Sequence, residues 1–132
     1  MKKPFRLITI VFFLFILWIL FSADTGKKNI FFDFVNMLPN GDKLGHFFLF
    51  GTLTLLLNFA LRFKSILLWQ KLPLGTILVS VFVLLEELSQ AFFPNRTLDI
   101  ADLIADGLGI LIFTLVGYLI FENKNFRMEK IK

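Results

Sequence analysis

The chain has 132 residues, of which 57% are hydrophobic, no cysteine, and a formal charge of +4 at pH 7. This length allows one domain, and the lack of cysteine excludes disulfides, thiolate metal sites and cysteine nucleophiles. Lys and Arg flank apolar segments instead of covering a polar face with aromatic residues between them, which argues against nucleic-acid binding. Because a soluble domain is usually about half apolar and the excess here lies in long runs, the composition predicts a membrane protein.

Four apolar segments are long enough to cross a bilayer as helices, which takes about 20 residues each. They cover approximately residues 5–23, 44–62, 72–93 and 101–121. Pro73 stands just inside the start of the third segment, and Pro94 helps to end it. The continuous apolar runs argue against the shorter, alternating strands of a β-barrel. We therefore predict an all-α polytopic membrane protein, a bundle of four transmembrane helices that forms a single domain over residues 1–132.

The first segment has the basic start of a signal peptide but not its end. Lys2, Lys3 and Arg6 precede an uncharged run. A cleavage site needs small residues, and Phe21 would occupy one of those positions. We interpret this segment as a retained membrane anchor.

The basic residues predict the orientation of the bundle, because cytoplasmic loops are enriched in Lys and Arg. Ten lie at one side: Lys2, Lys3, Arg6, Arg62, Lys64, Lys71, Lys124, Arg127, Lys130 and Lys132. Four lie at the other: Lys27, Lys28, Lys43 and Arg96. We expect both termini to be cytoplasmic (N-in/C-in), with the polar residues discussed next near the outer face.

The first outer loop, about residues 24–43, is largely apolar but is interrupted by Asp33 and Asn36. It is too short to span the membrane. Two interpretations stay open: an amphipathic turn or helix in the membrane interface, or a lid packed on the bundle.

The second segment opens with Asp42, Lys43 and His46. Asp42 and His46 are four residues apart, so a helix places them on one face. A carboxylate beside an imidazole fixes its tautomer, which suits a general base or a metal ligand. The alternative is structural: Asp42 caps the helix and a neighbouring helix satisfies His46. Because His46 is the only histidine, a histidine-rich zinc site is excluded.

The third segment closes with Glu86, Glu87 and Gln90. Either carboxylate can share a helix face with Gln90, and the other is turned by about 100°. A carboxylate facing lipid is costly, so we expect these groups to face protein. They are either part of a site or structural hydrogen-bonding groups between helices.

The fourth segment follows Arg96 and opens with Asp99, Asp102 and Asp106, whose spacings of three and four residues form one acidic stripe. Asp99 is expected to cap the helix, but Asp106 lies two turns deeper and is not explained by capping. Gly107, Gly109 and Gly117 predict close helix–helix packing.

Six acids near two fixed cations cannot all be ionised in a low dielectric. They are Asp42, Glu86, Glu87, Asp99, Asp102 and Asp106, and the cations are Lys43 and Arg96. We expect an internal ion-pair network, with a bound Ca²⁺ or Mg²⁺ as the alternative. No particular cofactor is indicated.

In these residues the chain resembles the VanZ-like family of small bacterial membrane proteins. The resemblance rests on D-K-x-x-H at Asp42, Lys43 and His46, E-x-x-Q at Glu87 and Gln90, R-x-x-D-x-x-D at Arg96, Asp99 and Asp102, and Gly109. It covers the last three helices in the family's order. The chain departs from the family at Asp106, where the family often has asparagine, and this adds a potential charge.

The family is named for a glycopeptide-resistance protein associated with teicoplanin. The resemblance therefore implies a multi-pass protein of the bacterial plasma membrane with a role in the envelope or in resistance, and it supplies no reaction.

Three functions are compatible with these features. The first is a membrane binding or accessory protein whose outward polar site engages a lipid-linked envelope precursor or a glycopeptide, with Arg96 and Lys43 meeting phosphate or carboxylate. The second is an outer-leaflet enzyme that hydrolyses a lipid-linked phosphate, with His46 or Glu87 as base and acids holding a metal. Proton or cation transport is disfavoured, because the ionisable residues gather at one end. The helices are either self-sufficient in membrane lipid or form a homo-oligomer through Gly109 and Gly117.

Overall fold

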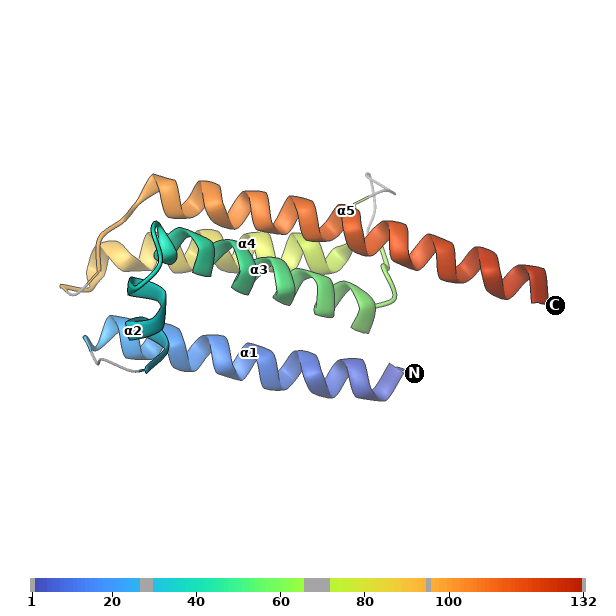
Figure 1. Cartoon of the computed structure of the whole chain (residues 1–132), viewed down its shortest axis with the longest axis horizontal. Coiled ribbons are helices and arrows are strands. Elements are labelled where there is room, and N and C mark those ends of the chain that lie inside the picture. The colour runs from blue at the N-terminus through green and yellow to red at the C-terminus, as the bar shows by residue number, and fades with distance from the viewer. Residues whose placement is uncertain (1, 27–29, 66–71, 95, 132) are drawn as a thin grey trace.

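The computed structural model describes residues 2–26, 30–65, 72–94 and 96–131. Its elements are α1 (Lys2–Asp24), α2 (Ile30–Asn36), α3 (Gly41–Ala60), α4 (Leu74–Ser89), the 3₁₀ helix η1 (Gln90–Phe92) and α5 (Ile100–Ile131) (Figure 1). Four of these stretches are long and apolar enough to cross a membrane: Lys3–Asp24, Gly41–Ala60, Leu74–Phe92 and Ile100–Asn125. The predicted all-α architecture with four membrane-spanning helices is confirmed at this level.

Some helix ends differ from the predicted bounds, because the helix begins or ends at other residues than the apolar run from which it was predicted. α3 begins at Gly41, so Asp42 and Lys43 lie in its first turn. It ends at Ala60, and Arg62 and Phe63 just beyond have positive φ values of 57° and 52°, the left-handed backbone that often follows a helix.

The last two long helices differ in a similar way. α4 begins at Leu74, so Pro73 stands immediately before the helix and not inside it. α5 continues to Ile131, beyond the predicted end at residue 121. The apolar run stops there, but the Glu, Lys, Arg and Met residues that follow favour helix.

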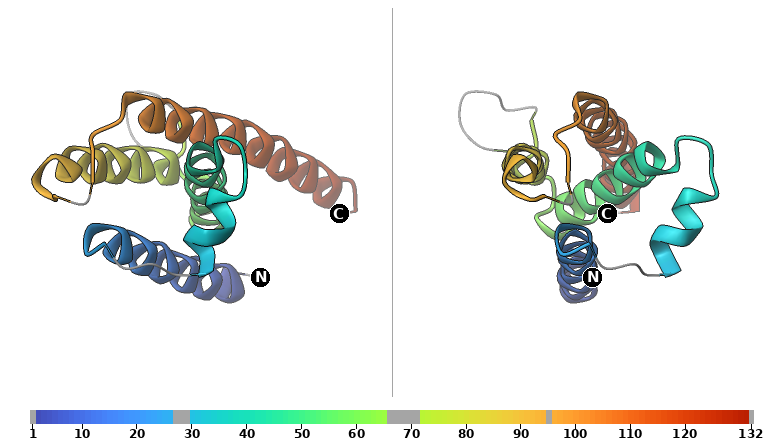
Figure 2. Two further views of the ribbon diagram at one scale, coloured as in Figure 1. Left: turned by 60° about the vertical axis from the view of Figure 1, so that its left-hand side comes forward. Right: turned by 90° about the vertical axis from the view of Figure 1, so that its left-hand side faces the viewer.

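Helix α3 is the centre of the bundle. It contacts α1, α4 and α5, and the right-hand view of Figure 2 shows it between α1 and α5, with α4 beside it. Phe50 and Leu53 of α3 are buried together with Ile16 of α1, Val79 and Val83 of α4, and Ile110 of α5. Since lipid tails are as apolar as these side chains, close packing and not water exclusion holds such an interface together.

Two of the three glycines expected to pack helices lie against α3. A Cβ at Gly109 would collide with the backbone oxygen of Phe47, and one at Gly117 would press on Leu55 and Phe63. At Gly107 an added Cβ would meet no atom of the described residues within 4 Å, so a packing role there stays a prediction. Both Gly109 and Gly117 have contacts within the same chain, and a homo-oligomer formed through them stays a prediction.

The first loop contains the short helix α2, which lies beside the start of α3. Phe31 contacts Phe15 of α1 edge to face, with ring centroids 6.0 Å apart. Ile30, Phe34 and Met37 are largely exposed. One side of α2 therefore packs on the bundle while the rest presents apolar side chains outward. Its position relative to a membrane interface stays a prediction.

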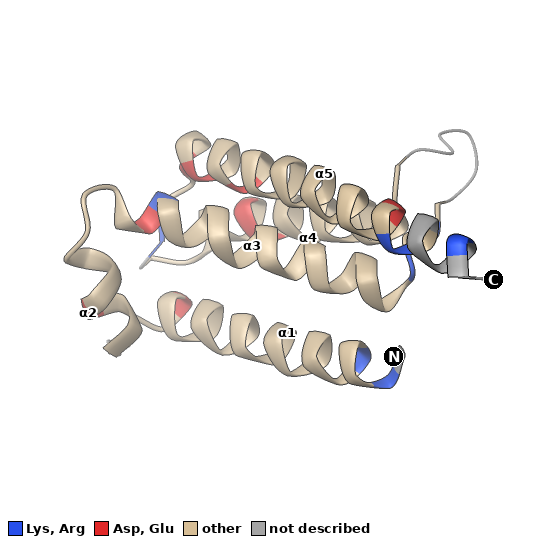
Figure 3. Ribbon diagram, turned by 45° about the vertical axis from the view of Figure 1, so that its right-hand side comes forward, with Lys and Arg blue, Asp and Glu red and all other residues tan. Residues whose placement is uncertain are grey.

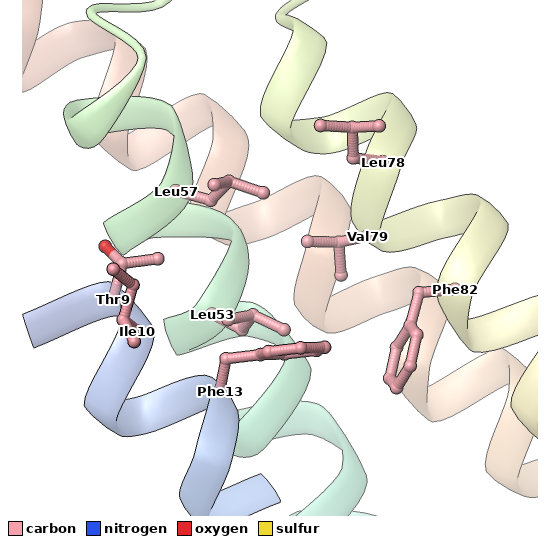
Figure 4. A pocket seen from close by; sticks show the side chains of 8 residues that line it. All are labelled: Thr9, Ile10, Phe13, Leu53, Leu57, Leu78, Val79 and Phe82. Carbon is pink, nitrogen blue, oxygen red and sulfur yellow. The ribbon is translucent and has the colours of Figure 1, made fainter. Parts of the chain in front are cut away.

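An apolar pocket of about 310 Å³ opens between α1, α3 and α4. Its lining comes from the middle and amino-terminal part of α1 and the facing parts of the other two helices (Figure 4): Thr9, Ile10, Phe13, Leu53, Leu57, Leu78, Val79 and Phe82. All but Thr9 are hydrophobic, so the pocket suits a hydrocarbon chain.

Candidate functional site

Acidic residues gather at one end of the bundle, where α1 and α4 end and α3 and α5 begin (Figure 3). We call this region the polar end. It consists of Asp24, Asp42, Lys43, His46, Glu86, Glu87, Gln90, Arg96, Asp99, Asp102 and Asp106. The antiparallel arrangement of the helices creates it, because it brings segments more than 70 residues apart in sequence side by side.

Lys43 joins α3 to the start of α5. Its Nζ lies 3.0 Å from Asp42 Oδ2, 3.4 Å from Asp99 Oδ2 and 3.3 Å from Asp102 Oδ1. Asp99 also caps α5, because its Oδ1 accepts a hydrogen bond of 2.8 Å from the backbone N–H of Ala101. The Lys43 side chain is 33% exposed, so water reaches these pairs and screens them.

His46 contacts acids of α5. Its Nδ1 lies 2.8 Å from Asp106 Oδ1, and its Nε2 lies 3.7 Å from Asp102 Oδ2. Asp42, which shares a helix face with His46 in the sequence, pairs with Lys43 and is largely exposed. The carboxylates that orient the imidazole thus come from another helix.

Glu86 and Glu87 are both buried, and Gln90 holds them together. The Gln90 Nε2 amide donates to Glu86 Oε1 and Oε2 at 3.0 and 3.1 Å, and it lies 3.3 Å from Glu87 Oε1. Neither carboxylate faces lipid.

Arg96 pairs with two acids, of which Glu86 is buried. Its Nη1 lies 3.2 Å from Asp24 Oδ1 at the end of α1, and its Nη2 lies 3.4 Å from Glu86 Oε1. Sequence reasoning missed Asp24, which is the contribution of α1 to the polar end. Its signal was its place at the same edge as the other acids.

Three groups of the polar end are close enough to hold a metal ion. One ligand atom each from His46, Glu87 and Asp106 lie within 4.8 Å of one another. Within the described part of the chain, two buried side-chain oxygens have no hydrogen-bond partner, Glu87 Oε2 and Asp106 Oδ2. Both belong to this group of three.

A second buried polar region lies in the other half of the bundle and was not predicted. Asn58 Nδ2 donates to Thr76 Oγ1 at 2.9 Å, and the Thr76 N–H donates to Asn58 Oδ1 at 3.2 Å. Thr76 Oγ1 lies 2.7 Å from Thr114 Oγ1. These three residues, which we call the neutral network, link α3, α4 and α5 without any charge.

The fold and the polar end define a multi-pass α-helical membrane protein with ionisable groups from four helices at one end, of which Glu86, Glu87 and Asp106 are buried. The family model VanZ/LLP1 matches residues 3–122, so the chain belongs to the VanZ/LLP1 family, and the resemblance seen in the sequence is confirmed. Searches of curated proteins and of solved structures returned no significant match.

Proposed function

We propose that the protein is a binding or accessory protein of the bacterial plasma membrane, whose polar end faces outward and engages a lipid-linked envelope precursor or a glycopeptide. The observation that carries this proposal is the convergence of ionisable side chains from four helices at one end of a membrane bundle. Buried charge in such a place is costly and usually has a role.

The distribution of basic residues supports the orientation. Described Lys and Arg residues away from the polar end lie near the two termini and after α3, at the opposite end of the bundle (Figure 3). Under the positive-inside rule this end is cytoplasmic. Both termini are then cytoplasmic, and the polar end is outside.

The contacts suggest which groups meet a ligand. Arg96 is engaged by Asp24 and Glu86, which favours a structural role over the ligand role considered from sequence. Lys43 is more accessible, and its ammonium can donate to a phosphate or carboxylate. The apolar pocket between α1, α3 and α4 could take the hydrocarbon chain of a lipid-linked ligand.

Cysteine labelling in intact cells tests the orientation, because the native chain contains no cysteine. Thr97→Cys, between α4 and α5, should react with an impermeant thiol reagent. Asn125→Cys, at the other end of α5, should react only after the cells are opened. The reverse pattern would place the polar end in the cytoplasm and refute the proposal.

Glycopeptide susceptibility and binding of a lipid-linked precursor test the ligand. If the native protein changes glycopeptide susceptibility or binds the precursor, Lys43→Gln should abolish that effect. Lys64 is an exposed lysine at the opposite end, so Lys64→Gln should leave the effect unchanged. Equal effects of the two substitutions, or no effect of the native protein in either assay, would count against a binding role at the polar end.

The grouping of His46, Glu87 and Asp106 favours one second candidate, a metal-dependent hydrolase of a lipid-linked phosphate at the outer leaflet. Release of phosphate from such a lipid by the purified protein in nanodiscs, lost on addition of a chelator, would distinguish this enzyme from a binding protein.

A further inference from the structure

We propose that the polar end holds one divalent transition-metal ion, with His46, Glu87 and Asp106 as its ligands. The three side chains come from α3, α4 and α5, so the ion would tie together the three helices that surround the buried part of the polar end. This inference goes beyond the proposed function, and it does not depend on which way the polar end faces.

The spacing of the three groups suits a shared ion. Their ligand atoms lie no more than 4.8 Å apart. Nitrogen and oxygen ligands bind such metals at about 2.0–2.2 Å, so two ligands of one ion are separated by up to about 4.3 Å. A small rotation of side chains that already face one another closes the difference.

Among the described residues, the hydrogen bonding leaves one oxygen free on each of the two carboxylates. Glu87 is 1% exposed and Asp106 is 0% exposed, yet each has one oxygen without a partner in the described residues. The other oxygen of each carboxylate is held, by Gln90 for Glu87 and by His46 for Asp106. A buried carboxylate oxygen without a partner is unfavourable, and a cation between these two oxygens would remove that cost.

The surrounding groups are placed as supporting partners. If His46 Nδ1, the nitrogen that lies 2.8 Å from Asp106 Oδ1 in this structure, binds the metal, it gives up its hydrogen bond to Asp106, whose carboxylate then binds the same ion. The proton is then on Nε2, which lies 3.7 Å from Asp102 Oδ2. A metal-bound histidine usually donates its second N–H to such a carboxylate, which fixes the tautomer and the ring orientation. Gln90 plays the equivalent part for Glu87, since its amide fixes one oxygen and leaves the other directed into the site.

The ligand types select the class of ion. One imidazole and two carboxylates suit Zn²⁺, Mn²⁺ or Fe²⁺, whereas Ca²⁺ and Mg²⁺ prefer ligand sets made of oxygen alone. The expectation of Ca²⁺ or Mg²⁺ drawn from the acids alone therefore changes once His46 is seen among them. A divalent cation would also offset the excess of acids at the polar end.

The test uses tag-free full-length protein in nanodiscs, stripped with a chelator and dialysed against Zn²⁺ or Co²⁺. We expect about one retained ion per chain, a visible d–d absorption band with Co²⁺, and displacement of Co²⁺ by Zn²⁺. Because His46 is the only histidine, metal-dependent shifts of imidazole NMR signals would report on this residue alone.

Matched variants locate the ion. Glu87→Gln and Asp106→Asn remove ligand charge with little change in shape and should weaken binding at least about tenfold, since loss of a supporting partner alone costs 10–100-fold. Asp42→Asn removes the same charge from an exposed carboxylate outside the group of three and should bind like the native protein.

If the variants fail to fold, metal retention and the His46 NMR signals of the native protein are enough to test the proposal. Folded native protein that retains no ion, or that binds one without moving the His46 signals, would overturn it. So would folded Glu87→Gln and Asp106→Asn variants with native affinity. If the native protein binds the metal but changes neither glycopeptide susceptibility nor the binding of a lipid-linked precursor, this inference stands and only the proposed function is refuted.

Discussion

The polar end and the neutral network lie in opposite halves of one bundle and satisfy their buried polar groups differently. In the neutral network the amide of Asn58 and the hydroxyls of Thr76 and Thr114 all have partners. At the polar end several ion pairs form, yet Glu87 and Asp106 each keep an unpartnered oxygen. A satisfied neutral network needs nothing else and serves the fold. An incompletely satisfied charged cluster is a place where a ligand can add stability.

The largest expected effect comes from breaking an ion pair at the polar end. Arg96→Ala leaves Glu86, which is 8% exposed, without its cation. Removing one partner of a buried pair costs about 3–5 kcal/mol, so the free energy of unfolding measured in mixed micelles should fall by roughly that amount. Glu86→Gln should recover part of the loss in the double variant.

Lys43→Ala is the matched control for this substitution. It removes a cation from the same end, but from a more exposed position where water can hydrate the acids left behind. Its effect should be clearly smaller. Equal losses for the two variants would mean that burial of Arg96 and Glu86 does not matter.

The pairing of Arg96 shows which features of the site could be predicted from the sequence and which could not. The long apolar runs predicted four spanning helices, and the place of each acid within its segment predicted that the acids gather at one edge. Spacing does not specify how helices rotate about their axes, so it could not show that Lys43 meets Asp102 while Arg96 meets Glu86 and Asp24. Single neutral polar residues within apolar runs gave even less signal, and for that reason the neutral network was missed.

A smaller loss is expected in the neutral network. Asn58→Ala leaves the buried hydroxyl and N–H of Thr76 short of a partner, and a buried group left unsatisfied costs about 1–3 kcal/mol. Ser80→Ala is the control, because the Ser80 hydroxyl donates to Thr76 O, a backbone group of its own helix. Metal retention by Asn58→Ala should match that of the native protein, and a loss of metal would show that the two regions are not separate.

The packing of α5 on α3 between the two regions is tested at Gly109, which lies against the backbone of Phe47. Gly109→Ala adds a methyl group that no rotamer change can accommodate, and overpacking of this kind costs about 1–3 kcal/mol. Gly107→Ala adds the same group where no atom of the described residues lies within 4 Å, and it should be neutral or stabilising by up to about 1 kcal/mol. Thermal unfolding of the two variants in detergent checks the contrast, which fails if Gly107→Ala is the more harmful change.

The smallest expected effect is the coupling energy between the two regions. Asn58 lies twelve residues beyond His46 on α3, about 18 Å along the helix axis. Sites this far apart with no shared partner usually add within about 0.3–0.5 kcal/mol. We therefore expect the unfolding free-energy changes of Arg96→Ala and Asn58→Ala to sum in the double variant. Arg96→Ala with Glu86→Gln should instead show a coupling of about 0.5–3 kcal/mol, because those residues touch. This second double-mutant cycle shows that the assay can detect coupling. Additivity in the first cycle, that of Arg96→Ala and Asn58→Ala, would then mean that the neutral network stabilises the bundle without influencing the polar end. A coupling in the first cycle as large as in the second would mean that both regions respond to one shared rearrangement of α3, and the division between scaffold and site would have to be abandoned.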